Sequence, residues 1–209
     1  MSSRPSKAAK AFLETHQRIL ELGNLHLQLR KQDGGPHKCC DDILRASVVL
    51  GVAAMDAFFT RRFCELLVPF LKKNGPNERL IALLSKAGLG AQAALEMAVM
   101  DRPFRRIRSL VETYLSDYTA QRFAAIDELF LTLGLRDISK HSAGKAGRAT
   151  LLRSVEKLVE RRHCIVHEGD LNRHGRLTAI DGRTILKRLR DTTLFVQHAD
   201  ALITTAVKV

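Results

Sequence analysis

Four side chains that could act on a phosphate lie within seven residues of one another, and Gly169 follows where a helix would stop. They are Arg161, Arg162, His163 and His167. Imidazole titrates near neutral pH and can take or give a proton, whereas a guanidinium stays charged and matches a phosphate with a planar fork. These residue types favour acid–base chemistry at a phosphate.

Metal-free cleavage of an RNA phosphodiester is one reaction that such a group could carry out. It needs a base to take the proton of the ribose 2′-hydroxyl, an acid to protonate the leaving 5′-oxygen, and a cation to hold the charged phosphorane. All three can come from the stretch Arg162–His167.

Two other interpretations of the histidines stay open. His163 and His167 share one helix face and could hold zinc, but the H-E-x-x-H pattern needs Glu where this chain has Cys164, and a third ligand would have to come from elsewhere. The histidines could instead be structural, bonded to Glu160 or to a carbonyl near the helix end. We predict no metal and no other cofactor.

Charges of opposite sign interrupt two predicted apolar stripes. Arg162 lies on the stripe of the helix that carries the histidines, and Asp56 lies on the stripe of an earlier helix. A buried charge is costly alone, whereas two opposite charges on neighbouring helices relieve each other. We therefore predict that Asp56 approaches Arg162 or Arg161. Alternatively, a local rotation places Asp56 in water at the edge of its stripe.

The spacing of Arg162 and His167 sets a geometric condition. Five residues turn an ideal helix by roughly 140°, so one helix does not aim both side chains at one point. Either the helix loosens near Gly169, or two copies of it meet across a two-fold axis and each supplies part of the site. We favour the dimer, which would also explain an arginine on an apolar stripe.

Apolar periodicity divides the chain into helices joined by short loops. The predicted helices are 8–31, 41–71, 78–87, 91–100, 103–116, 119–133, 149–167 and a last one after Asp181. We expect Gly34–Pro36 to end the first helix, Asp41 or Asp42, Asp101 and Asp181 to be N-caps, and 134–147 and 168–176 to be non-helical. No strand pattern stands out, apart from 177–180, which could be extended.

These elements predict an all-α fold, an up-and-down helical bundle with appended short helices. A chain of 209 residues can form one sizeable core. We predict a single domain over 1–209, with a flexible tail at 1–7, an N-terminal helix and linker at 8–40, and the bundle at 41–206.

The formal net charge of +12 favours a polyanionic partner, with nucleic acid first and a membrane surface second. The densest basic cluster is Arg102, Arg105, Arg106 and Arg108. This cluster could be a solvated helix face, or a patch that follows RNA phosphates.

The cysteines and the apolar runs favour a soluble cytoplasmic protein. The four cysteines, Cys39, Cys40, Cys64 and Cys164, form no C-x-x-C motif, and no signal peptide opens the chain, so we expect reduced thiols in a cytosol. The longest apolar run, 46–59, is interrupted by Asp56 and is too short to cross a bilayer.

The stretch Arg162–His167, R-H-C-I-V-H, resembles the hallmark of HEPN domains, in which an arginine and a polar residue precede a histidine. The flanking L-V-E-R and H-E-G-D are similar to the RiboL-PSP-type branch of that family. So is the earlier I-L-R-A-S-V-V-L-G-V-A-A-M-D-A-F-F, with Asp56 at the acidic position. The likeness covers roughly 41–206. A second arginine–histidine match, Arg136–His141, lies in a Gly/Ser/Lys-rich region outside the predicted helices.

The resemblance implies a dimeric, metal-independent endoribonuclease of a toxin–antitoxin, antiviral-defence or stress system, with an antitoxin or regulatory protein as a further partner. It implies that Arg162 and His167 are catalytic and that His163 is their polar companion, where the family more often has Asn. We expect Asp56, Glu160 and Arg161 to support them. The rival interpretations are a non-catalytic module of the same fold that binds RNA, a nucleotide or a protein, and a plain interaction bundle.

Overall fold

The computed structural model describes residues 4–32 and 38–206, and over these residues the chain forms nine α-helices and no strand. The helices are α1 (Lys7–Gln32), α2 (Lys38–Asn74), α3 (Glu78–Lys86), α4 (Ala91–Ala98), α5 (Pro103–Ser116), α6 (Phe123–Leu131), α7 (Ile138–Lys145), α8 (Leu151–Glu168) and α9 (Gly182–Ala206). A single antiparallel bridge joins Leu171 and Leu177 between α8 and α9. The predicted all-α fold is confirmed.

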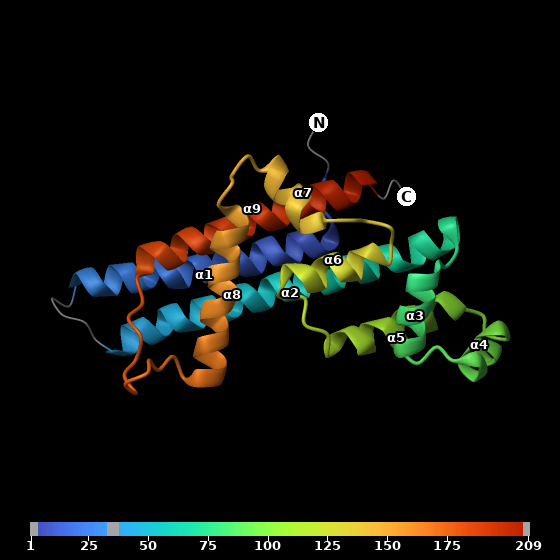
Figure 1. Cartoon of the computed structure of the whole chain (residues 1–209), viewed down its shortest axis with the longest axis horizontal. Helices are drawn as coiled ribbons and strands as arrows, with labels where there is room; N and C mark the ends of the chain where they lie inside the picture. Colours follow the sequence, from blue (N-terminus) through green and yellow to red (C-terminus); the bar gives the residue numbers. More distant parts are fainter. Residues whose placement is uncertain (1–3, 33–37, 207–209) are drawn as a thin grey trace.

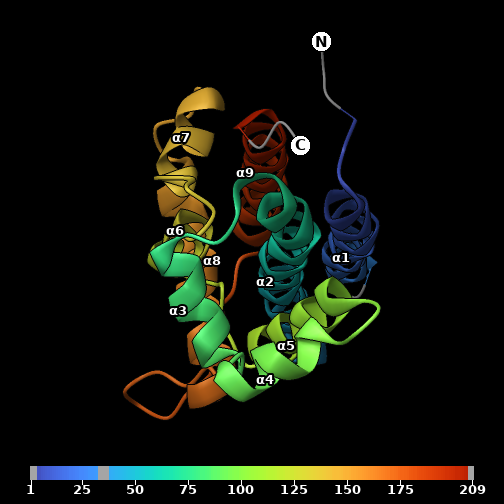
Figure 2. The ribbon, with the colours of Figure 1, turned by 90° about the vertical axis from the view of Figure 1, so that its right-hand side faces the viewer.

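Three long helices form the body of the molecule (Figure 1). The helices α2 and α9 run in the same direction, α1 runs against both, and α8 crosses this layer steeply. Turned by 90°, α2 and α9 lie between α1 on one side and α6, α7 and α8 on the other, with α4 and α5 at one edge (Figure 2). The first half of α8 crosses the long helices, and its second half extends past α2 (Figure 1).

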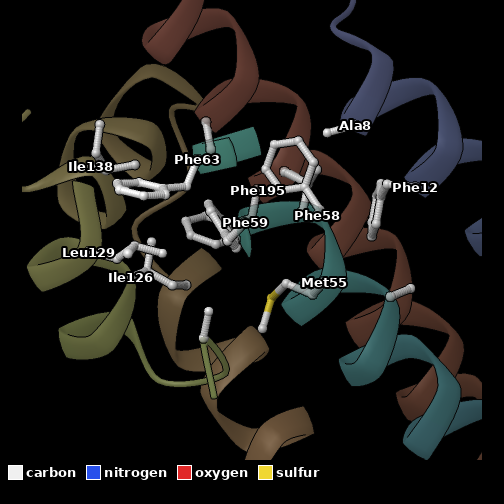
Figure 3. Close-up of a cluster of buried hydrophobic side chains, with 14 of the residues drawn as sticks. Ala8, Phe12, Met55, Phe58, Phe59, Phe63, Ile126, Leu129, Ile138 and Phe195 are labelled. Atoms are coloured by element: carbon white, nitrogen blue, oxygen red, sulfur yellow. The ribbon is translucent and has the colours of Figure 1, made fainter. Parts of the chain in front are cut away.

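An aromatic cluster on α2 forms the centre of the core (Figure 3). Phe59 lies with its ring centroid 5.7 Å from that of Phe195 on α9, and Phe63 meets Phe130 on α6 edge-on at 6.1 Å. All four rings are buried, so one helix is packed against two others by large apolar surfaces in the tilted geometries that aromatic pairs prefer. This cluster fixes α6 relative to α2.

The two ends of α8 are fastened by buried carboxylates. At the start, Ser154 donates a 2.6 Å hydrogen bond to Asp191 of α9, which also accepts from Arg148. Just past the end, Asp170 accepts from Arg45 of α2 at 2.6 Å. Because charge-assisted bonds of this length are strong, α8 is held across the long helices in one orientation.

Several predicted boundaries are wrong. Residues 134–147 are not a loop but contain α7, whose first turn is capped from α6: the Ser139 N–H donates to Asp127 at 2.8 Å. Asp101 does not cap α5, since the N-cap is Arg102 without a side-chain bond. Asp41 lies inside the first turn of α2.

Other predicted boundaries agree with the structure. Asp181 does cap α9, accepting from the Thr184 N–H at 2.8 Å. The expected end of α1 at 34–36 lies outside the described residues.

By length and composition alone, the stretch Cys40–Asn74 of α2 could cross a membrane, contrary to the expectation from the run 46–59. Half of its most apolar window is buried inside the molecule. A central core helix has this character as well, so the apolarity of α2 is explained by its packing.

Candidate active site at the C-terminal end of α8

The helix α8 stays regular through the candidate residues. Its buried face is formed by Leu151, Ser154, Val155 and Leu158. It ends at Gly169, whose φ of 63° is the left-handed conformation that glycine adopts without strain. The N–H groups of Gly169 and Asp170 both donate to the carbonyl of Cys164 and close the last turn. The loosening near Gly169 that the spacing allowed does not occur.

Arg162 and His167 nevertheless come together within one chain. Arg162 Nη1 lies 3.4 Å from His167 Nε2, a long hydrogen bond in which the guanidinium can only donate. The length of the arginine side chain bridges the angle between the two positions, so a partner copy is not required for this contact.

His163 lies beside this pair. The ring centroids of His163 and His167 are 4.6 Å apart and their planes are inclined by 43°. Both imidazoles are exposed, and Arg162 is half-buried. Two rings at this distance can face the same substrate group, one to accept a proton and the other to donate one.

These side chains form one wall of a cleft of about 890 Å³. The other wall is the segment before α6 and its first turn. The cleft is lined by Thr119, Gln121, Arg122, Phe123, Ala124, Ala125, Glu156, Val159, Glu160, Arg162, His163, Cys164 and His167.

The wall opposite the histidines is also suited to an anion. The helix α6 begins at this wall without a side-chain cap, so its first N–H groups and the positive end of its dipole lie at the cleft. Arg122 adds a second guanidinium facing the same space as Arg162. The predicted helix starts at 119, so Arg122 falls within its first turn and nothing in the sequence marks it as a helix start or a site residue. Arginine is an uncommon N-cap residue, so the residue types at this position do not indicate that a helix begins at Phe123.

Asp56 supports the cleft in a different way from the one predicted. Its carboxylate accepts from the Ala120 N–H at 2.7 Å and from Gln121 Nε2 at 2.9 Å, and over the described residues it pairs with neither Arg161 nor Arg162. The predicted ion pair is wrong because the segment before α6 reaches Asp56 and satisfies it. Asp56 thereby holds in place the segment that carries Arg122.

Arg161 faces away from the cleft. Its Nη2 donates to Asp170 at 2.7 Å and to the carbonyl of Thr178 at 3.0 Å. Asp170 is only 1% exposed and also binds Arg45, so two guanidinium groups share one buried carboxylate. Asp170 ends the motif H-E-G-D, but the sequence pattern assigns it no role. Its signal was an acidic residue directly after a helix-ending glycine, which is too common to single out.

The remaining candidate residues are separate from the histidines or make no bond to them. Glu160 lines the cleft, but over the described residues no hydrogen bond joins it to either histidine. Burial, followed by the nearby Glu168, raises the pKa of Cys164, which makes this thiol a poor nucleophile. No group of three or more metal-ligating side chains is found in the described part of the chain.

The basic cluster on α5 does not belong to the cleft. Arg102, Arg105, Arg106 and Arg108 are all exposed, and the helix packs against α2, α3 and α4. Arg108 donates to Glu112 at 2.7 Å, and this bond raises the pKa of Arg108.

Comparison of the chain with known protein families, with curated proteins and with solved structures finds no match in any of the three.

Proposed function

We propose that this protein is a metal-independent endoribonuclease that cleaves RNA by attack of the ribose 2′-hydroxyl on the adjacent phosphate. The observation that carries the proposal is the 3.4 Å contact between Arg162 and His167, beside His163, in a cleft large enough for a nucleotide. A phosphate-binding cation and two titratable rings are the groups that this reaction requires.

In this mechanism His167 is the main acid and base, because its exposed ring lies next to the phosphate-binding group Arg162. Arg162 holds the phosphate and the charge that develops on it, and Arg122 holds the same anion from the opposite wall. His163 orients the substrate or supplies the second proton transfer. Asp56 and Arg161 keep the two walls in place, and Glu160 lies at the cleft as a supporting anion.

We propose further that the protein acts as a cytoplasmic homodimer formed through α8, in a toxin, defence or stress system with a neutralising or regulatory protein. Leu152, Val159 and Val166 lie seven residues apart on one face of α8, the first two half-buried and the third 46% exposed. A line of apolar residues at this spacing is typical of helices that pair with a second helix.

Incubation of the purified protein with end-labelled single-stranded RNA tests the activity. We expect fragments with 2′,3′-cyclic phosphate and 5′-hydroxyl ends, at the same rate with and without EDTA. His167→Ala should lower the rate by at least about 100-fold, the usual contribution of one acid–base group. The matched control is His141→Ala, in the second arginine–histidine match. Over the described residues, the exposed His141 ring is hydrogen-bonded to the backbone carbonyl of Arg136 and to no other group, so the rate should not change.

Three results would contradict the mechanism: loss of cleavage in EDTA, cleavage by His167→Ala at the parent rate, or an equal loss in His141→Ala. Salt-sensitive binding of RNA with no cyclic-phosphate product would instead support the non-catalytic RNA-binding module.

A further inference from the structure

A short hairpin follows α8 directly and is not part of the cleft. The Asn172 N–H donates to the Arg176 carbonyl at 2.8 Å, and the Gly175 N–H donates to the Asn172 carbonyl at 2.9 Å. The Asn172 side chain also accepts from the N–H groups of His174 and Arg176. The turn between Leu171 and Leu177 is therefore stabilised by its own hydrogen bonds.

The base of this hairpin is pinned to two helices. The Thr178 N–H donates to the Asp170 carbonyl at 2.8 Å, and the Thr178 carbonyl accepts from Arg45 of α2 and Arg161 of α8, each at 3.0 Å. The same two arginines hold the buried Asp170 carboxylate. The tip is thus held in a fixed place at the end of α8, from which it projects (Figures 1 and 2).

The tip carries only basic charge. Arg173, His174 and Arg176 are exposed, and the segment 171–177 contains no acidic residue. Over the described residues, neither arginine forms an ion pair, whereas Arg108 on α5 is paired with Glu112. Arg173 Nε donates to the His174 ring at 3.1 Å, which leaves its terminal N–H groups and the Arg176 guanidinium without a carboxylate partner and available to an external anion.

We propose that this basic hairpin, residues 171–177, binds the phosphodiester backbone of an RNA strand whose reacting nucleotide occupies the cleft. The inference rests on the proposed function. The hairpin begins just after His167 along the chain, so a strand that leaves the cleft past the end of α8 meets it. The segment has no Phe, Tyr or Trp, and its two arginines match phosphate oxygens, so we expect it to contact phosphates and to be indifferent to base sequence.

RNA binding of a catalytically silent His167→Ala protein tests this contact over a range of salt concentrations. The parent is compared with Arg173→Ala/Arg176→Ala and with the matched control Arg105→Ala/Arg106→Ala on α5, which loses the same charge. For a single-stranded 20-mer, loss of two phosphate contacts should reduce the slope of log Kobs against log salt by about 1.4. The control should keep the parent slope. Arg173→Lys/Arg176→Lys should restore the slope, because lysine keeps the charge.

A second measurement separates failure of this inference from failure of the proposed function. In the active protein, the hairpin variant should raise KM for the 20-mer and leave cleavage of a dinucleotide unchanged, because a dinucleotide is too short to reach the hairpin. If no RNA is cleaved but the hairpin variant alone loses the salt slope, the contact of the hairpin with RNA phosphates stands and the proposed function fails. If RNA is cleaved and both double variants bind like the parent, or if the hairpin binds anionic vesicles and not RNA, the inference is overturned.

Discussion

At the scale of single residues, the two charges that interrupt the apolar stripes do not pair with each other. Asp56 is satisfied by the segment before α6, and Arg162 contacts His167. The neighbouring Arg161 pairs with Asp170. The need for a partner follows from the cost of burying a charge and could be predicted. The identity of the partner could not, because it depends on which loops reach the buried group. Arg162 and His167 were predicted to meet either through a loosened helix end or, as favoured, across a dimer, and they meet instead within one regular helix.

Replacing the buried carboxylate tests the importance of that pairing. Asp170→Asn should lower the free energy of unfolding by about 3–5 kcal/mol, because two guanidinium groups lose their shared anion in a buried place. Asparagine tolerates the left-handed backbone at this position, where φ is 58°, so added strain does not explain the loss. Urea denaturation of the variant and the parent measures the difference.

The matched control is Asp42→Asn, which removes the other carboxylate bonded to Arg45. The Asp42 side chain is 66% exposed, so its loss should cost less than about 1 kcal/mol. If the two variants lower the free energy of unfolding equally, the buried Asp170 contributes no more to stability than the exposed Asp42.

At the scale of elements, apolar periodicity predicted the long helices well and the short ones less well. Amphipathic stripes identify α1, α8 and α9 because each buries one face. The helix α7 has little amphipathicity and a Gly/Ser/Lys composition, and it is held by Asp127 of α6. Such a helix depends on tertiary contacts and is not predictable from local pattern. The helix α6 begins at Phe123 rather than at the predicted 119, because the segment before it is held by a tertiary contact with Asp56. This start brings Arg122 to the cleft.

The contact between α1 and α9 should make stability depend on pH. His16 Nε2 donates to the Leu189 carbonyl at 2.9 Å, and Nδ1 is buried without a partner in the described structure. Burial lowers the pKa of His16 below its usual 6.5, so the ring is neutral when folded. The unfolded chain then binds the extra proton more readily, and His16 should reduce the free energy of unfolding as pH falls below about 6.5.

Urea denaturation between pH 7 and pH 5 measures this dependence. His16→Gln can still donate to Leu189 but does not titrate, so its stability should fall less steeply than that of the parent. His141→Gln replaces an exposed histidine and should keep the parent slope. If the free energy of unfolding of His16→Gln falls with pH as steeply as that of the parent, then groups other than His16 cause the pH dependence.

At the scale of the whole molecule, composition predicted an all-α protein but not how its helices cross. The steep crossing of α8 over the long helices follows from contacts between residues far apart in sequence, such as Ser154 with Asp191 and Arg45 with Asp170. The helices α2 and α9 approach closely at Gly51, where a Cβ atom would lie closer than van der Waals contact to a terminal methyl of Leu189. The cleft could be predicted only in part for the same reason. One wall is the continuous stretch 156–167, and the other comes from residues 119–125, which lie elsewhere in the sequence.

The proposed dimer places the exposed end of the α8 apolar line against a second copy. Analytical ultracentrifugation at micromolar concentration should give the parent twice the mass of one chain. Val166→Glu should give the mass of one chain, because a carboxylate would be buried without a partner at the interface. The control is Val99→Glu, at a valine that is 88% exposed just after α4 and far from α8 in the fold, and this variant should remain dimeric. A monomeric parent, or a dimer unaffected by Val166→Glu, would remove α8 as the interface. The contact of Arg162 with His167 would remain, because one chain forms it alone.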